Sequence, residues 1–172
     1  MPDIEQGLIL LAEYQVDCVI VGGVAAGVHG YSQETSDVDA CYARDSENLE
    51  RLASALRSVQ ARLRGAPKGI PFILDAETLR RGLNFTFETE IGALDLLGEI
   101  RGVGGYAECL ANCIRIEIFG HNFNVLSLEK LVTAKRTAGR TKDLLALPEL
   151  EAILEYERGS AVRGEARTDD DT

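Results

Sequence analysis

Two aspartates separated by one residue lie in DVDACYA, a segment that begins by alternating acidic and apolar side chains. This period of two predicts a strand that carries Asp37 and Asp39 on one face and Val38 and Ala40 on the other. Residues i and i+2 of a strand are about 6 to 7 Å apart along the chain, so the two carboxylates can bind one divalent cation or two neighbouring ones. The segment therefore predicts a strand with a candidate metal site on its acidic face.

A glycine pair precedes this strand. The run DCVIVGG ends in Gly22 and Gly23, and thirteen residues separate Gly23 from Asp37. The β-branched run predicts a strand, and VAAGVHG after it predicts a short helix. Because glycine has no Cβ, backbone N–H groups at the start of such a helix can approach phosphate oxygens. Each motif alone is common, but their order and spacing favour a site where divalent cations and phosphate groups meet, as phosphoryl transfer requires.

The rest of the chain alternates helical and strand-like segments. Apolar periodicity and capping residues, Ser46 and Ser127 as N-caps and Gly139 as an end signal, predict helices. These helices cover residues 4–14, 46–63, 127–139 and about 141–156. Two hairpins are predicted over 83–98 and 113–126, and 65–82 is predicted as a loop with a short helix over 76–81. The pattern predicts an α+β fold, with a mixed sheet of about five mixed or antiparallel strands flanked by helices.

Length and charge limit the class of protein. With 172 residues, 45% of them hydrophobic, the chain suits one domain, which we expect over 1–157, followed by a disordered acidic tail over 158–172. The formal net charge of −10 repels a phosphate backbone and argues against broad, non-specific nucleic-acid binding. No stretch approaches the roughly 18 apolar residues of a membrane span, and acidic residues near the start do not fit a signal peptide. We therefore expect a cytoplasmic protein with no membrane partner.

Other residues that could carry chemistry have simpler interpretations. Four cysteines could indicate zinc, but free buried thiols are favoured by roughly four to one because their spacing forms no ligand cluster. The two histidines are isolated and are expected to be structural. These residues are Cys18, Cys41, Cys109, Cys113, His29 and His121. The chain also contains no serine-hydrolase elbow and no P-loop lysine motif.

The glycine pair and the Asp37-Val38-Asp39 motif together resemble the signature of the polymerase-beta-type nucleotidyltransferase superfamily. Further stretches are similar to its small prokaryotic AbiEii-like and minimal nucleotidyltransferase groups, and the likeness spans most of residues 15–155. They are GGVAAGVHG, TSDVDACY, ALDLLGEIRGVGGY and LSLEKLVTAKRTAGRTKDLLALPEL. The resemblance implies a nucleotidyltransferase fold and a third carboxylate on a later strand. Asp95, flanked by two leucines, takes that place.

The resemblance also implies an activity: transfer of a nucleoside monophosphate from a nucleoside triphosphate to a hydroxyl. Asp37, Asp39 and Asp95 would be both catalytic residues and ligands of Mg²⁺ or Mn²⁺. The acceptor in such groups is a protein, a tRNA or a small molecule, and the acidic charge disfavours tRNA here. Several members belong to toxin–antitoxin systems, which suggests a toxin or antitoxin protein as a partner. The alternative is a non-catalytic module of the same fold that binds nucleotide or serves as an antitoxin-type partner.

The basic segment KRTAGRTKD concentrates positive charge in an acidic chain. Lys135 could reach the β- or γ-phosphate, and Lys142 begins the next helix. The alternative, that these residues are only a solvated basic helix end, is given a probability of about two in five. The chain also departs from the family pattern. The loop before Asp37 carries Gln33-Glu34 where relatives often carry arginine, and Gly23 replaces a serine. Thr35 or Ser36 would have to supply the missing hydroxyl.

Overall fold

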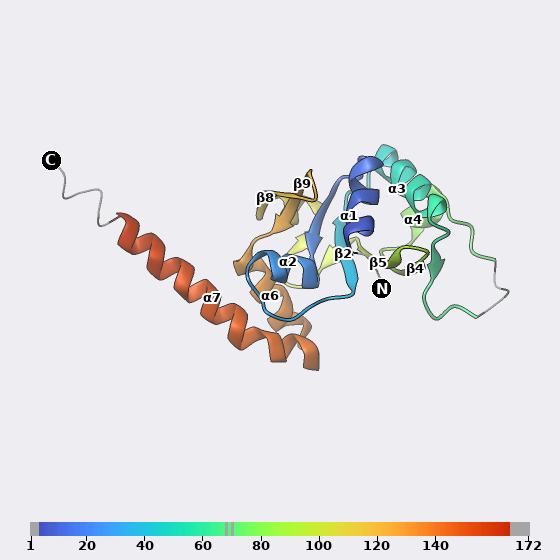
Figure 1. The fold of residues 1–172 in the computed structure, drawn as a ribbon. Helices are drawn as coiled ribbons and strands as arrows, with labels where there is room; N and C mark the ends of the chain where they lie inside the picture. Colours follow the sequence, from blue (N-terminus) through green and yellow to red (C-terminus); the bar gives the residue numbers. More distant parts are fainter. Residues whose placement is uncertain (1–3, 68, 70, 166–172) are drawn as a thin grey trace.

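The computed structural model describes residues 4–67, 69 and 71–165 and is built around one sheet (Figure 1). The sheet has seven strands in the order β3-β4-β5-β2-β1-β9-β8. Their bounds are β1 Cys18–Val21, β2 Asp37–Tyr42, β3 Arg62–Leu63, β4 Asn84–Thr89, β5 Gly92–Leu97, β8 Cys113–Ile118 and β9 His121–Leu126. A separate two-stranded ladder joins β6 (Glu99–Ile100) and β7 (Gly104–Gly105). The predicted fold class is confirmed, and the strand count is higher than the expected five.

Strand directions are mixed, as expected. β4 and β5 form one antiparallel hairpin, and β8 and β9 form the other. β1 is antiparallel to β2 but parallel to β9, and β2 is parallel to β5. The parallel pair β2–β5 joins segments more than fifty residues apart, so no local turn sets its register. This pair brings the acidic strand against the hairpin that carries Asp95.

Helices cover both faces of the sheet. On the face of Val38 lies α1 (Ile4–Glu13), where a Cβ at Gly7 would be 3.0 Å from Val38 Cγ2. On the opposite face, α5 (Tyr106–Ala111) contacts β1, β2 and β9. The other helices are α2 (Gly22–Val28), α3 (Ser46–Ser58), α4 (Ala76–Arg81), α6 (Leu128–Ala138) and α7 (Thr141–Glu165). The later part of α7 extends away from the sheet (Figure 1).

The core follows the register of the strands. Phe87, Leu94 and Val38 are paired across β4, β5 and β2, so their side chains share one face, and all three are buried. The rings of Phe85 and Phe87 stack with centroids 5.8 Å apart. Phe72, from the segment after β3, lies 6.2 Å from Phe87. This apolar layer anchors one face of the sheet in the core, and the side chains of Asp37, Asp39 and Asp95 project from the opposite face.

Several element boundaries differ from the prediction. The side chain of Asp45 caps α3 by accepting from the backbone N of Asn48, so Ser46 is the first helical residue rather than the cap. The helix expected over 46–63 ends at Ser58, and its last predicted residues form β3 instead. The short helix α5 was not predicted. Helix α7 continues to Glu165, so residues 158–165 of the expected tail are helical, and 166–172 lie outside the described part.

Other predicted boundaries are confirmed. Ser127 caps α6 through its side chain, and the helix ends at Gly139 with a left-handed φ of 62°. A left-handed residue of this kind is a common helix stop because glycine adopts it without steric cost. None of the helices in the described part has both the length and the hydropathy needed to cross a bilayer.

Candidate active site

The three predicted aspartates lie on one face of two adjacent strands. Asp39 in β2 pairs with Asp95 in β5, and Asp37 pairs with Ala93. In a parallel pair, directly opposed residues project to the same side, and residues i and i+2 do likewise. The register therefore brings together three carboxylates that are distant in sequence, and none of the three is fully exposed.

Asp39 is the most perturbed of the three. Burial raises its pKa from 3.8 to about 6, the nearby charge of Asp95 adds to the rise, and a hydrogen bond from the backbone of Gly23 opposes it. A raised pKa means that the folded protein holds this carboxylate at a cost when it is ionised. Electrostatically strained acids of this kind gather at functional sites, where a cation can relieve the strain.

The glycine pair is fitted against this acid strand. Gly22 has a φ of +62°, and a Cβ there would lie 2.1 Å from Asp39 Oδ2. A Cβ on Gly23 would lie 2.5 Å from Thr35 Oγ1. Both positions therefore lack space for a side chain, and Gly22 also needs a backbone conformation that other residues rarely adopt. The close approach places the backbone at the start of α2 directly beside Asp39.

Thr35 and Ser36 belong to the loop before β2. Ser36 Oγ donates to Asp37 Oδ1 at 2.8 Å, and the backbone N of Asp37 approaches Thr35 Oγ1 at 3.4 Å. The loop is fixed at its other end by Ser32, which donates from its backbone N and its hydroxyl to the carboxylate of Glu149 in α7, at 2.8 and 3.0 Å. Both predicted hydroxyls thus lie next to the acids.

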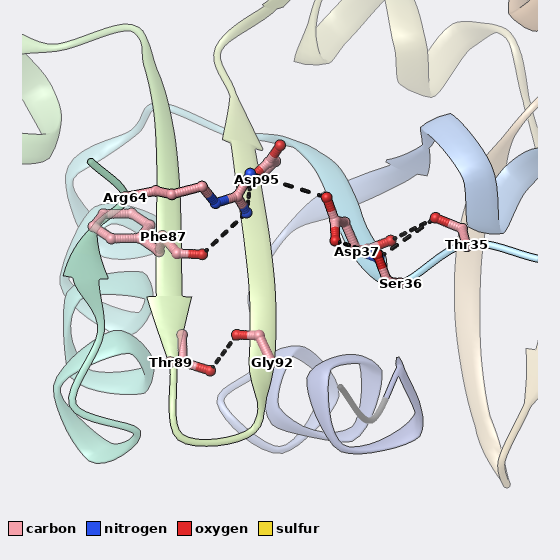
Figure 2. A network of polar contacts seen from close by, with 8 residues as sticks. All are labelled: Thr35, Ser36, Asp37, Arg64, Phe87, Thr89, Gly92 and Asp95. Atoms are coloured by element: carbon pink, nitrogen blue, oxygen red, sulfur yellow. Dashed lines mark hydrogen bonds and ion pairs between the residues drawn. The ribbon is translucent and has the colours of Figure 1, made fainter. Parts of the chain in front are cut away.

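Arg64 was not expected in this site. Its Nη2 lies 3.0 Å from Asp95 Oδ1, and its Nη1 lies 3.9 Å from Asp37 Oδ2 (Figure 2). Burial raises the pKa of Asp95, and the positive charge of Arg64 opposes that rise. Arg64 could not be recognised from the sequence, because it follows β3, a two-residue strand whose residues were predicted as the end of the helix over 46–63. Only the pairing of β3 with β4 reveals it.

The basic segment divides into two groups. Lys135 Nζ lies 3.3 Å from Oδ1 of Asp143, whose Oδ2 accepts from Arg140 Nε at 2.7 Å. Lys142 is exposed, and its positive charge opposes the rise that burial causes in the pKa of Asp39 and of Asp95. The charges of Lys142 and Arg140 therefore both act on Asp39 and Asp95, whereas Lys135 is engaged by Asp143 at the corner between α6 and α7. The role of Asp143 was not predicted, because it depends on how two helices meet.

The acidic site has the donor chemistry of a divalent-cation site. Carboxylate oxygens are the ligands that Mg²⁺ and Mn²⁺ prefer, and the register aims three of them at one region. Within the described residues, however, no three Asp, Glu, His or Cys side chains already form a closed metal cluster. Asp37 and Asp95 face the guanidinium of Arg64 instead. The residues fit a metal in kind and share one strand face, and their side chains would have to move before three of them could bind one ion.

The cysteines and histidines carry no comparable arrangement in the described chain. All four cysteines are free; Cys113 is partly exposed, and the other three are buried as expected. Cys41 and Cys109 are in hydrogen-bond contact, and burial raises the pKa of Cys18 to about 12, which leaves an unreactive thiol. The ring Nε2 of His29 lies 2.8 Å from the carbonyl oxygen of Leu126, so this histidine links α2 to β9.

Comparison with known proteins gives a match at the level of structure. No protein-family model matches the chain, and no curated protein matches it in sequence. The fold is similar to that of ANT(2'')-Ia in complex with adenylyl-2''-tobramycin, with a TM-score of 0.56 and 16% identity over 94% of this chain and 92% of that one. It is also similar to the lincosamide antibiotic adenylyltransferase LnuA, lincomycin-bound, with a TM-score of 0.55 and 14% identity over 86% of this chain and 94% of that one. The chain therefore has the nucleotidyltransferase fold.

Proposed function

We propose that this protein is a metal-dependent nucleotidyltransferase that moves a nucleoside monophosphate from a nucleoside triphosphate to a hydroxyl acceptor. One observation carries the proposal: Asp39 and Asp95 are directly paired across β2 and β5, with Asp37 on the same face. The similarity in fold to the adenylyltransferase LnuA, and to ANT(2'')-Ia bound to adenylyl-2''-tobramycin, supports the same chemistry. Phosphoryl transfer depends mostly on positioning and on neutralising charge, and a convergent set of carboxylates serves both needs through bound cations.

We assign each aspartate a role in this proposal. Asp37 and Asp39 would hold Mg²⁺ or Mn²⁺ together, and Asp95 would join them at the ion nearest the acceptor. When bound, the metal supplies charge neutralisation on the phosphates and lowers the pKa of the acceptor hydroxyl. Asp95, whose own pKa is raised, is suited to take the proton from that hydroxyl.

The triphosphate would lie along the edge formed by the glycine pair and Lys142. Gly22 and Gly23 offer backbone N–H groups with no side chain in the way. Thr35 and Ser36 offer hydroxyls in the adjoining loop. Lys142, whose charge already acts on Asp39 and Asp95, is the better placed of the two predicted lysines. Lys135 would contribute mainly through Asp143, which it contacts.

The acceptor is proposed to be a small-molecule or protein hydroxyl rather than a tRNA. The net charge of −10 opposes a polyanion. ANT(2'')-Ia and LnuA are described with tobramycin and lincomycin, which are small molecules. The sequence resemblance to AbiEii-like proteins adds a cytoplasmic role in a toxin–antitoxin pair, with a protein as either acceptor or partner.

A second function, nucleotide or partner binding without catalysis, is favoured by two specific features. Arg64 contacts two of the three acids, and the loop before Asp37 has Gln33-Glu34 where an arginine is common in similar sequences. In that case the protein would retain the fold as an antitoxin-type subunit. Nucleotide binding without turnover would distinguish this function from the first.

The test combines binding and transfer. Titration calorimetry with ATP, GTP, CTP and UTP, each with and without Mg²⁺, should give metal-dependent binding of at least one triphosphate. Asp37→Asn and Asp39→Asn should abolish it, whereas Glu117→Gln should bind as the wild type does. Glu117 is an exposed acid on β8 at the far edge of the sheet, so it matches the loss of charge without touching the site. Absence of binding in all conditions would contradict the proposal.

Transfer is then measured with α-labelled triphosphate and panels of small-molecule and protein acceptors. Label that moves to an acceptor in the wild type and not in Asp95→Asn supports the enzyme. If the triphosphate binds but no label is transferred to any acceptor tested and no pyrophosphate is released, the non-catalytic binding function is favoured instead.

A further inference from the structure

The position of Arg64 is fixed by backbone pairing. Its backbone N donates to the carbonyl oxygen of Thr86 at 2.9 Å, which extends the β3–β4 ladder by one residue beyond Leu63. Thr86 is paired with Asp95, and Asp95 with Asp39. Arg64, Thr86, Asp95 and Asp39 thus form one row across four strands, and residues in such a row project from the same face. The arginine is directed to the acids by the sheet itself.

The side chain of Arg64 contacts one acid of this row, Asp95, and two groups of neighbouring rows, Asp37 and the carbonyl of Phe87. Nη2 donates to Asp95 Oδ1 at 3.0 Å and approaches the carbonyl oxygen of Phe87 at 3.4 Å, while Nη1 lies 3.9 Å from Asp37 Oδ2. The side chains of Asp95, Arg64 and Asp37 are 18%, 33% and 35% exposed, so water screens these charges only in part. Figure 2 shows the guanidinium beside Asp95 of β5, with the carbonyl of Phe87 in β4 and the carboxylate of Asp37 in β2 on either side.

The carboxylate of Asp37 is engaged on both sides. Its Oδ1 accepts from Ser36 Oγ, and its Oδ2 faces Arg64. A divalent cation that binds Asp37 together with Asp39 or Asp95 needs an oxygen lone pair and a space that a second cation does not occupy. The guanidinium and a metal ion therefore compete for the same oxygens.

We infer that Arg64 is a positioning residue that neutralises Asp37 and Asp95 in the metal-free protein and competes with the divalent cation for them. This inference rests on the proposed function only in assuming that the acids bind metal. With a metal bound, the guanidinium would lose Asp37, and its contacts with the carbonyl oxygen of Phe87 and with Asp95 Oδ1 would keep it beside the site. Arg64 thereby lowers the affinity for free metal and keeps the three acids from repelling one another when no metal is present.

Competition makes a prediction that a purely structural role does not. Removing the guanidinium should strengthen the binding of Mn²⁺ alone, by about fivefold for a partly exposed ion pair. Arg64→Gln tests this by titration calorimetry, with the Mn²⁺ electron paramagnetic resonance signal as a second measurement. Arg62→Gln is the matched control, because Arg62 is an exposed arginine of β3, two residues from Arg64, and the acids that Arg64 contacts form no ion pair with it. Arg64→Lys keeps a positive charge and should bind Mn²⁺ within about twofold of the wild type.

The outcomes separate this inference from the proposed function. Tighter Mn²⁺ binding in Arg64→Gln but not in Arg62→Gln supports competition. The same conclusion holds if the wild type and Arg62→Gln bind too weakly to measure and Arg64→Gln binds measurably. Unchanged or weaker binding in Arg64→Gln, with binding still lost in Asp39→Asn, overturns the role of Arg64 and leaves the metal site intact. No Mn²⁺ binding in any variant overturns both.

A measurement on the unaltered protein covers the case in which Arg64→Gln does not fold. Side-chain ¹⁵Nε spectra should show the Arg64 signal moving during a Mg²⁺ titration, in step with saturation, while the Arg62 signal stays in place. An Arg64 signal that does not respond while the Asp39 backbone signal does would overturn the inference.

Discussion

Two aspartates of this protein, the partly buried Asp39 and the buried Asp143, have opposite electrostatic surroundings. Asp143 is 1% exposed and contacts both Lys135 and Arg140, and these basic partners lower its pKa. At Asp39, burial raises the pKa to about 6, and the negative charges of Asp95 and Asp37 add more to this rise than Lys142 takes away. The first acid is satisfied by the fold and stabilises it, whereas the second is held at a cost. The difference separates a structural acid from one that requires a cation from outside.

The largest effect is expected from Asp143. Asp143→Asn leaves the positive charge of Lys135 without its partner in a mostly buried position, since Lys135 is only 15% exposed. Removing one partner of such a pair should lower the free energy of unfolding by about 3 kcal/mol. Urea denaturation at pH 7.5 measures this loss. Because the pKa of Asp143 is lowered, its contribution is present above the ordinary value of 3.8 and is lost as the pH falls below it. If Asp143→Asn is as stable as the wild type at pH 7.5, Asp143 is not a stabilising acid and its contrast with Asp39 does not hold.

The opposite sign is expected for Asp39. A pKa raised from 3.8 to about 6 means that ionised Asp39 destabilises the fold above that window, and the penalty disappears as the pH falls through it. Asp39→Asn should therefore raise the free energy of unfolding of the metal-free protein at pH 7.5 by roughly 2 kcal/mol, after allowance for partial exposure. The gain should shrink between pH 6 and pH 4. Thermal melts in chelator at pH 7.5 and pH 4.5 check it, and a destabilised variant at pH 7.5 would contradict it.

A smaller effect, a loss of stability, is expected at Gly22, whose backbone lies close against the carboxylate of Asp39. Gly22→Ala adds a Cβ 2.1 Å from Asp39 Oδ2 at a φ of +62°, so both the backbone and the acid must shift. The expected loss is about 1 to 2 kcal/mol. Repeating the substitution in an Asp39→Ala background sharpens the test, because removal of the opposing carboxylate should recover part of the loss. Equal losses in both backgrounds would show that backbone strain alone is responsible.

The smallest effect is expected at Arg140, the exposed partner of Asp143. Arg140 is 65% exposed, and exposed ion pairs contribute little to stability. Arg140→Gln should lower the free energy of unfolding by less than about 1 kcal/mol, as long as Lys135 remains. Urea denaturation beside Asp143→Asn measures the difference. A loss as large as that of Asp143→Asn would mean that Arg140, and not Lys135, satisfies the buried carboxylate.

The sequence predicted those parts of the fold that depend on neighbouring residues. The alternation around Asp37 and Asp39, the two hairpins, the Ser127 cap and the Gly139 stop all appear in the structure. Local patterns failed where a segment had no local signal of its own. The two residues of β3 were absorbed into the apolar period of the preceding helix, and helix α7 continued past the point where apolar periodicity ends.

The sequence by itself determined which residues could form an acidic strand face and that a glycine pair precedes this strand. The tertiary structure alone decided which carboxylates meet. Asp39 lies beside Asp95 because β2 pairs with β5 in parallel. Arg64 is positioned next to these acids by the pairing of its backbone with β4. Asp143 contacts Lys135 because α6 and α7 meet there. The physical reason is that periodicity and capping act over a few residues, whereas strand order, register and helix contacts are chosen by burial of the whole core.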